Sequence, residues 1–317
     1  MNPVLWVACR RSRRRSHVAN PDTVVQRRDA QLRVAVARSV PDERLVITDT
    51  SVELAGRATR VRLYRPARLT GSAPGFLFLH GGGFFGGSIE NSDPHARMYA
   101  LHAQCVVASL DYRLAPEHPW PAATDDAWAA LQWLAGSAAQ LEIDPARIAI
   151  GGVSAGANIA AVTAIRARDE DGPRLVLQLL EIPVVDLTQS SASMSAFATG
   201  YITTRAELAE GNAYYVPDPT KRADPRVSPV FARDLAGLPP AFILINEFDP
   251  LRDEGEQYAT RLREAGVRAE LVRARGHVHG STLSSAWWLP SARRYQRRTA
   301  AALRDAFAVN AAPTDHA

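Results

Sequence analysis

The chain has 317 residues, 46% of them hydrophobic, with two cysteines and a formal net charge of +4. We expect one catalytic domain with a cap and no disulfide framework, and no membrane span because no apolar run approaches about 18 residues. Residues 1–38 hold nine arginines and only two acids, so the remaining chain is net −3 and its charge argues against nucleic-acid binding.

The N-terminal arm, residues 1–45, contains the arginine-rich run 10–15. We interpret this run as a solvated tail, with contact to phosphate or a membrane surface as the alternative. A short apolar stretch, Pro3 to Ala8, precedes the arginines, which is the reverse of the order in a secretion signal. Because cysteines are also few, we expect a cytoplasmic protein, and we expect the arm to form part of the cap.

Strand-like and helical runs alternate along the rest of the chain. The strand-like runs are short and apolar, and longer helix-prone stretches separate most of them. This alternation predicts an α/β fold with a mainly parallel sheet and helices on both faces. The expected strands are 76–79, 106–110, 148–151, 175–180, 242–245 and 270–272, and the expected helices are 94–103, 122–134, 154–168, 253–265 and 293–307.

The alternation breaks between Asp186 and Pro229. This interval has a serine-rich segment at 190–193, helical character from Thr204 to Tyr215, and two prolines directly afterwards. An insertion at this place in the chain is where a cap over the sheet would lie. The expected organisation is therefore a catalytic core over 46–185, a cap insertion over 186–229 and the rest of the core over 230–317.

A Gly-x-Ser-x-Gly motif, Gly152-Val153-Ser154-Ala155-Gly156, follows one expected strand and leads into a helix. Strand, sharp turn and helix in this order form a nucleophile elbow, which exposes a serine hydroxyl at the end of a sheet. Gly152 and Gly156 are needed because side chains at those positions would collide with the turn. The motif predicts Ser154 as a nucleophile, and an ordinary tight turn is the alternative for such a motif alone.

A glycine loop, His80-Gly81-Gly82-Gly83, ends the expected strand 76–79. Ester hydrolysis passes through a tetrahedral oxyanion, and backbone N–H groups aimed at it supply much of the rate. Glycines let the main chain approach a substrate closely, and a strand followed by His-Gly-Gly-Gly is the lipase and esterase form of this loop. A flexible glycine turn is the alternative interpretation.

An acid and a histidine complete this pattern. Asp249 comes just after the expected strand 242–245, and His279 follows the last expected strand. Nucleophile, acid and base in the order Ser154, Asp249, His279 is the order of α/β-hydrolases and not of chymotrypsin or subtilisin. A serine hydroxyl is a poor nucleophile near neutral pH, so it needs an adjacent imidazole that takes its proton.

Rival assignments stay open in the sequence. His277 lies two residues before His279, and in an extended segment the two rings point the same way, although the His-Gly pair favours His279. Asp253 and Glu254 are alternative acids. They begin an expected helix, however, and negative charge at a helix N-terminus is stabilising without any catalytic role. A metal bound by His277 and His279 lacks further nearby ligands, so we expect none.

Taken together, the motifs resemble the hormone-sensitive-lipase family of α/β-hydrolase esterases, which carry a His-Gly-Gly-Gly loop. The resemblance spans about residues 60 to 308 and rests on His80–Gly83, Asp111–Pro119, Gly152–Gly156 and Asp249–Gly255. It implies an α/β-hydrolase fold with an eight-stranded type of sheet and a mostly helical cap. It also implies a Ser/Asp/His triad and neither a metal nor an organic cofactor.

Carried over by position, the resemblance makes Ser154 the nucleophile, Asp249 the acid and His279 the base. His80 would anchor its loop without carrying a proton. The oxyanion donors would be the N–H groups of Gly82, Gly83 and Ala155, the loop scaffold His80 and Gly81, and the elbow glycines Gly152 and Gly156.

The chain departs from the family at Val153, where an Asp is usual, at Ala157, where a Gly is usual, and at Ser281, where an aromatic residue is common. Neither Val153 nor Ala157 takes part in proton transfer, so we expect reduced or shifted selectivity without inactivity. Ser281 is expected to open the pocket near the base. Aromatic side chains are expected to line the pocket, with packing of the cap as the alternative. These are Phe84, Phe85, Phe197, Tyr201, Tyr214 and Tyr215.

We therefore expect a carboxylic-ester hydrolase that acts on small-molecule esters of short- to medium-chain acids through an acyl-serine intermediate. Outside catalysis the alternative is a small-molecule receptor on the same fold, since fold alone does not fix function. Gibberellin receptors resemble this family but lack the triad histidine. Amide or formamide hydrolysis and acyl transfer would use the same residues, and a homodimer stays open.

Overall fold

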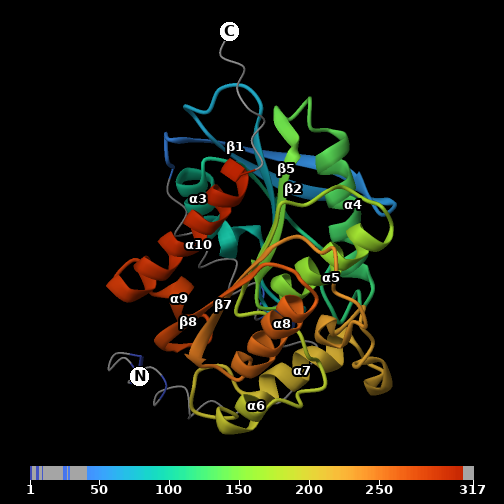
Figure 1. Cartoon of the computed structure of the whole chain (residues 1–317), viewed down its shortest axis with the longest axis vertical. Coiled ribbons are helices and arrows are strands. Elements are labelled where there is room, and N and C mark those ends of the chain that lie inside the picture. The colour runs from blue at the N-terminus through green and yellow to red at the C-terminus, as the bar shows by residue number, and fades with distance from the viewer. Residues whose placement is uncertain (2–4, 7–8, 10–23, 27, 29–40, 310–317) are drawn as a thin grey trace.

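A computed structural model describes residues 1, 5–6, 9, 24–26, 28 and 41–309 (Figure 1). The arginine-rich run 10–15 and most of the N-terminal arm lie outside these residues, so the interpretation of that run stays a prediction. Within the described ranges, every helix is too short or too polar to cross a lipid bilayer.

Eight strands form one sheet, in the spatial order β1-β2-β4-β3-β5-β6-β7-β8. The pairs β1·β2 and β2·β4 are antiparallel, and every later pair is parallel. The predicted eight-stranded, mainly parallel sheet is therefore confirmed. The strands are β1 (Leu45–Leu54), β2 (Arg57–Pro66), β3 (Ala73–Leu79), β4 (Val106–Leu110), β5 (Ile143–Val153), β6 (Leu177–Glu181), β7 (Ala241–Phe248) and β8 (Ala269–Val278).

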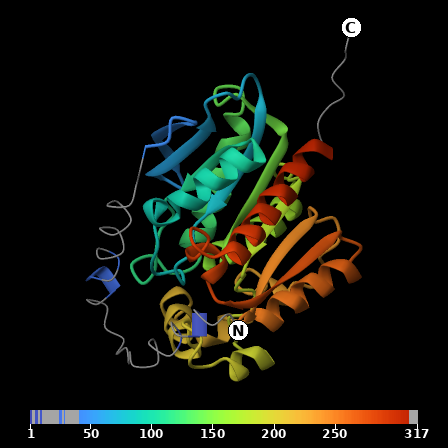
Figure 2. The same ribbon diagram turned by 90° about the vertical axis from the view of Figure 1, so that its left-hand side faces the viewer.

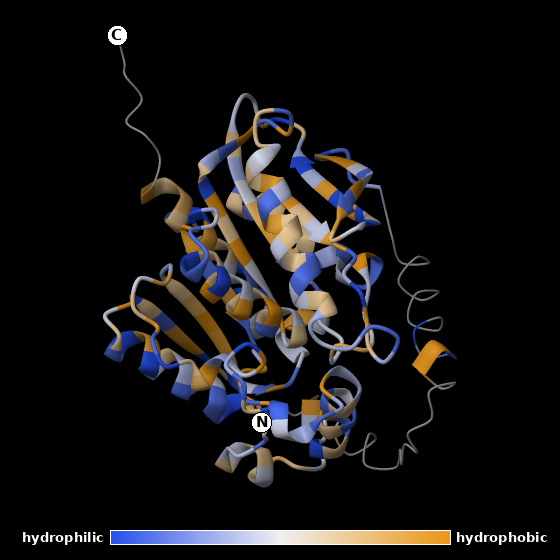
Figure 3. Ribbon diagram, turned by 90° about the vertical axis from the view of Figure 1, so that its right-hand side faces the viewer, coloured by the Kyte–Doolittle hydropathy of each residue, from blue (hydrophilic) through white to orange (hydrophobic). Residues whose placement is uncertain are grey.

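Helices cover both faces of the sheet (Figures 1 and 2). Leu131, Ile159 and Leu262, from α4, α5 and α8, belong to one hydrophobic cluster, and Tyr99 and Leu303, from α3 and α10, belong to a second. In Figure 3 hydrophobic colour follows the strands and hydrophilic colour marks the outer sides of the helices. The helices of the core are α3 (Ile89–Ala103), α4 (Ala122–Gly136), α5 (Ala155–Asp169), α8 (Arg252–Glu264), α9 (Ser281–Ser284) and α10 (Pro290–Val309).

The segment 186–229, which the sequence predicts to be a cap and which is called the cap below, lies beyond the carboxyl ends of the parallel strands (Figure 1). Its longest helix, α7, begins with a capping box in which Thr204 and Glu207 each bond the other's backbone N–H. Asn158 in α5 donates through Nδ2 to the carbonyl oxygens of Val184 and Val227, each at 2.8 Å, and so holds both stems of the insertion. The cap elements are α6 (Ala192–Ala196), α7 (Arg205–Tyr215) and the short 3₁₀ turns η1 (Pro219–Lys221) and η2 (Pro229–Phe231).

The antiparallel hairpin β1–β2 was not among the predicted strands. It lies at the edge of the sheet, where β1 fully buries only its two end residues, and polar residues interrupt the apolar ones along both strands, so neither strand appears as a long apolar run. Its turn is formed by Ala55 and Gly56, both with positive φ (47° and 76°), the combination that a two-residue type I′ turn requires.

Glu181, at the end of β6, is a fully buried carboxyl. The Tyr99 hydroxyl donates to its Oε1, and within the described residues its Oε2 has no partner. Burial raises the pKa of Glu181 from 4.5 to about 7. The unfolded chain releases this proton from about pH 4.5 upward and the folded chain only near pH 7, so the residue increasingly destabilises the fold across that interval.

Replacing Glu181 with Gln is therefore expected to raise the free energy of unfolding by about 3 kcal/mol above pH 7. Well below pH 4.5 the carboxyl is protonated in both states, and even at pH 5 the substitution should change the free energy of unfolding by less than about 1 kcal/mol. Urea unfolding at pH 5 and pH 8 measures the difference. Glu43→Gln at an exposed position is the control and should show no such pH dependence. Equal effects of Glu181→Gln at both pH values would contradict the prediction.

Candidate active site

Ser154 lies in the sharp turn between β5 and α5, with φ 55° and ψ −115°. Its backbone N–H donates to the carbonyl oxygen of Glu181 in the next strand at 2.8 Å. A side chain on either Gly152 or Gly156 would overlap the carbonyl oxygen of Leu79, which explains the two small residues of the motif. The backbone of the predicted elbow therefore has the strained conformation, with positive φ at the serine, that a nucleophile elbow requires.

The side chains of Ser154, His279 and Asp249 form a continuous hydrogen-bonded row. Ser154 Oγ lies 3.1 Å from His279 Nε2, and His279 Nδ1 lies 2.8 Å from Asp249 Oδ2. Asp249 is buried, and its Oδ1 accepts the Leu251 N–H at 2.9 Å. Asp249 directly follows β7 and His279 directly follows β8, so the ends of two adjacent strands present the pair (Figure 1).

The rival histidine has different partners. His277 is buried, with its Nδ1 2.9 Å from Ser281 Oγ and its Nε2 3.0 Å from Ser291 Oγ. Burial lowers the pKa of His277 to about 4. The extended segment that would make the two rings point the same way does not include His279, because β8 ends at Val278. Among the described residues no three His, Cys, Asp or Glu side chains group as metal ligands.

The rival acids also bond elsewhere. Asp253 accepts the backbone N–H of Ser193 in the cap at 2.7 Å. Glu254 accepts the N–H groups of Val185 and Asp186, and burial raises the pKa of its carboxyl well above its usual range. Both residues lie in the first turn of α8, as expected, but their carboxylates connect this helix to the cap and its stem.

The glycine loop turns sharply after β3. Gly82 has φ +137°, and a side chain there would overlap the carbonyl of Gly86, whose N–H donates to Gly82 O at 2.8 Å. Gly83 also has positive φ, at +63°. Within the described part of the chain, no acceptor takes the N–H groups of Gly82 and Gly83. Ala155 opens α5, so its N–H has no acceptor inside that helix.

His80 is fully buried and stacks on Tyr112, with ring centroids 4.2 Å apart. The Tyr112 hydroxyl donates to the His80 carbonyl oxygen at 2.7 Å, and His80 Nδ1 lies 2.9 Å from the carbonyl oxygen of Gly81. Burial lowers the pKa of His80, which keeps its ring neutral. These contacts fit a residue that holds the loop in place.

The predicted aromatic residues divide into two groups. Phe84 and Tyr215 are buried and stack in parallel 4.0 Å apart, so these two pack the cap onto the glycine loop, and Phe85 lies 5.5 Å from Tyr214 beside them. Phe197 and Tyr201 of the cap gather instead around Phe248, the residue before Asp249. Sequence reasoning did not single out Phe248, although it lies directly before Asp249.

Arg28 is a second residue that sequence reasoning missed. Its Nε donates to the carbonyl oxygen of Phe85 at 2.6 Å, and its Nη1 bonds Glu117 Oε1 at 2.7 Å. Another bond reaches the carbonyl oxygen of Ala115. One arginine of the basic arm is therefore bound beside the glycine loop. Nothing in the sequence distinguishes Arg28 from the other arginines of the arm.

Ser281 is buried and does not open the pocket near His279, contrary to expectation. Its hydroxyl donates to the Val278 carbonyl oxygen at 2.8 Å and accepts the Val278 N–H at 3.0 Å. The side chain is thus turned into the protein toward His277. Val153 and Ala157, the other two departures from the family, are likewise buried in the core.

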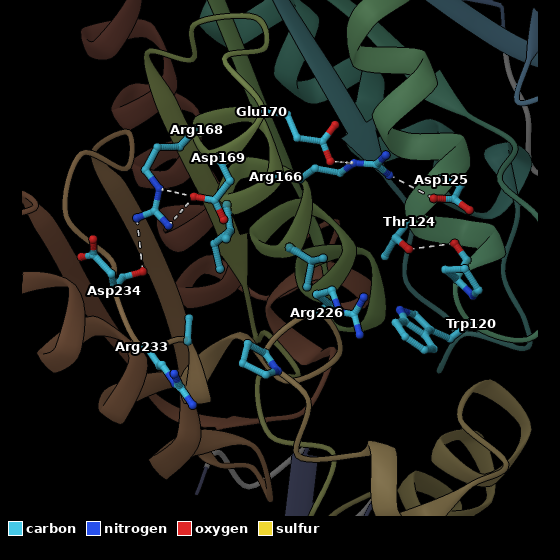
Figure 4. A pocket seen from close by; sticks show the side chains of 15 residues that line it. Trp120, Thr124, Asp125, Arg166, Arg168, Asp169, Glu170, Arg226, Arg233 and Asp234 are labelled. Atoms are coloured by element: carbon cyan, nitrogen blue, oxygen red, sulfur yellow. Dashed lines mark hydrogen bonds and ion pairs between the residues drawn. The ribbon is translucent and has the colours of Figure 1, made fainter.

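A separate cavity of about 770 Å³ lies between α4, α5 and the stretch 225–234 (Figure 4). None of the three residues of the hydrogen-bonded row lines it. Figure 4 shows that its charged side chains largely neutralise one another, as when Arg166 bonds both Asp125 and Glu170. The cavity therefore presents no concentrated charge and no nucleophile.

The chain matches the α/β-hydrolase fold family over residues 76–283. Carboxylesterase NlhH of Mycobacterium tuberculosis is 44% identical over 250 residues, 78% of each chain. The arylesterase of Saccharolobus solfataricus is 37% identical over 246 residues, 77% of this chain and 80% of that relative. The crystallised esterase of Pyrobaculum calidifontis has a TM-score of 0.88 at 36% identity, covering 96% of this chain and 98% of that chain.

This protein belongs to the α/β-hydrolase fold family, in the hormone-sensitive-lipase-like group whose motifs it carries. Its curated relatives at 40–44% identity over most of the chain are ester hydrolases, and so is this protein.

Proposed function

We propose that the protein is a carboxylesterase for short- to medium-chain acyl esters, with Ser154 as nucleophile, His279 as base and Asp249 as acid. The observation that carries the proposal is the hydrogen-bonded row from Ser154 Oγ through His279 to Asp249, at 3.1 and 2.8 Å. The N–H groups of Gly82, Gly83 and Ala155 beside the elbow support it.

In the first half of the reaction, Ser154 Oγ attacks the ester carbonyl while His279 Nε2 takes the hydroxyl proton. Asp249 holds the proton on His279 Nδ1 and stabilises the imidazolium that forms, without itself being protonated. The free backbone N–H groups of the glycine loop and of Ala155 donate to the oxyanion. The imidazolium then protonates the leaving alcohol, and an acyl-Ser154 remains.

In the second half, water attacks the acyl-Ser154. His279 takes a proton from the water and returns one to Ser154 Oγ as the carboxylic acid leaves. One imidazole therefore acts as base and then as acid in each half.

The aromatic cluster of Phe197, Tyr201 and Phe248 supports a limited acyl length. Its rings lie 5.0 to 6.0 Å apart, and Phe248 immediately precedes the acid. Rings packed this closely at the site close off part of the space that a long hydrocarbon chain needs. Short to medium chains are thus the preferred acyl groups in our proposal.

A panel of p-nitrophenyl esters from acetate to palmitate, with an organophosphate inhibitor, tests the proposal. We expect the highest kcat/KM among the short and medium chains and one inhibitor molecule bound to the peptide that contains Ser154. Labelling at another residue would remove Ser154 as the nucleophile. Absence of ester turnover in the folded protein, with turnover of amides instead, would favour the amidase alternative.

A further inference from the structure

The pairing of β7 with β8 contains an irregularity beside the site. The register is regular from Ala241↔Ala269 to Asn246↔Ala274, but Phe248 pairs with Val278. Between these pairs β7 has one residue and β8 has three, so β8 carries a bulge of two extra residues. The bulge, residues 275–277, therefore shifts every later residue of β8 by two positions relative to β7.

This shift decides which histidine lies beside Asp249. Continued without the bulge, the register would pair Phe248 with Gly276 and place His277 next to Asp249. With the bulge, Phe248 pairs with Val278 and His279 takes that place. A shift of two keeps side chains on the same face of a strand, so alternation alone cannot resist a slip between the two registers.

Side chains of α10 and of β7 accept hydrogen bonds from the backbone of the bulge. The Arg275 N–H donates to the Tyr295 hydroxyl of α10 at 3.1 Å, and the Gly276 N–H donates to Glu247 Oε2 at 2.7 Å. His277, the third residue of the bulge, is fully buried between Ser281 and Ser291, with the edge of the Tyr295 ring against it.

The hydrogen bonds around His277 determine which of its two ring nitrogens carries the proton. Ser281 Oγ uses its own hydrogen on the Val278 carbonyl oxygen, so it can only accept from His277 Nδ1 at 2.9 Å. His277 Nδ1 therefore carries the proton, and Nε2 accepts the hydroxyl hydrogen of Ser291. A neutral ring satisfies both serines, and through Ser281 it is joined to both backbone groups of Val278, the residue before His279.

We propose that His277 is a positioning residue: with Ser281 and Ser291 it fixes the two-residue bulge, and the fixed bulge presents His279 to Asp249 and Ser154. The role rests on the proposed function of His279 as the base. It also accounts for Ser281, where the family commonly has an aromatic residue, because an aromatic ring there could not accept from His277.

The test compares kcat, KM and the downfield ¹H resonance of the His279 Nδ1 proton in His277 variants. His277→Ala should lower kcat by about 10²-fold with KM nearly unchanged, because a loss of that size is expected when a catalytic group is displaced by about 1 Å. The same variant should weaken the resonance. His277→Asn keeps a donor toward Ser281 and should recover most of kcat. His277→Gln, which reaches Ser291 but not Ser281, should recover less, and Ser291→Ala should lose less than His277→Ala.

Leu303→Ala, which removes a buried side chain nearer the C-terminal end of α10, is the control for lost stability. It should lower the melting temperature and leave kcat and the resonance unchanged. Wild-type kcat and resonance in His277→Ala, or an equal loss of kcat in Leu303→Ala, would overturn the positioning role. Because the resonance needs no turnover, its persistence in His277→Ala counts against positioning even if the proposed ester activity fails.

Discussion

Replacing Ser154 with Ala is expected to lower kcat for p-nitrophenyl acetate by about 10⁴-fold or more without unfolding the protein. The substitution removes only the Oγ that lies 3.1 Å from His279 Nε2, and alanine keeps the backbone of the turn. Without that oxygen no acyl-enzyme can form, and only the binding and oxyanion contributions to catalysis remain. Steady-state kinetics, together with a melting curve to show that the variant is folded, measure the effect.

Ser195→Ala in the cap helix α6 is the matched control, because Ser195 is exposed and has no contact with the hydrogen-bonded row. Its kcat should stay within about twofold of the wild-type value, as expected of a surface substitution. Near-normal activity of Ser154→Ala would end the proposed mechanism, whatever the effect of the control.

Replacing Asp249 with Asn is expected to lower kcat by about 10⁴-fold near neutral pH. The Leu251 N–H at 2.9 Å from Oδ1 orients the new side chain, because it requires an acceptor and so directs the amide NH₂ toward His279. His279 Nδ1 must then accept, which places the ring proton on Nε2. In that tautomer Nε2 cannot take the proton of Ser154.

Asp253→Asn separates this effect from a general loss of charge near the site. The Asp253 carboxylate bonds the cap at Ser193, so kcat should fall only a few-fold, and KM is the more sensitive quantity. A larger loss of kcat in Asp253→Asn than in Asp249→Asn would transfer the role of the acid to Asp253.

The parallel part of the sheet could be predicted because its strands are buried on both faces and therefore appear as apolar runs. The run 106–110 coincides with β4 residue for residue. Helix α3 begins five residues before the predicted start at Pro94, because Ser88 caps it by accepting the Asn91 N–H. The hairpin β1–β2 escaped prediction because polar residues interrupt the apolar ones along both of its strands.

In the candidate site, sequence motifs predicted the residues that local backbone geometry requires. The turn at Ser154 and the loop at Gly82 need glycines at fixed spacings, and a pattern of glycines can be found in a sequence. The choice between His277 and His279 depends instead on the register between β7 and β8. Register arises from contacts with α10 and Glu247, which lie far along the chain, so neither local spacing nor alternation could predict it.

The two hydrogen bonds that Asn158 donates to the stems of the insertion have a consequence for how such enzymes diversify. The insertion leaves the core after β6 and re-enters it at β7, two strands that are neighbours in the sheet. Because Asn158 ties Val184 and Val227 to α5, the helix that follows Ser154, both stems have fixed positions whatever residues lie between them. In our proposal, selection or engineering can therefore exchange the segment between the stems while Ser154, His279 and Asp249 keep their positions.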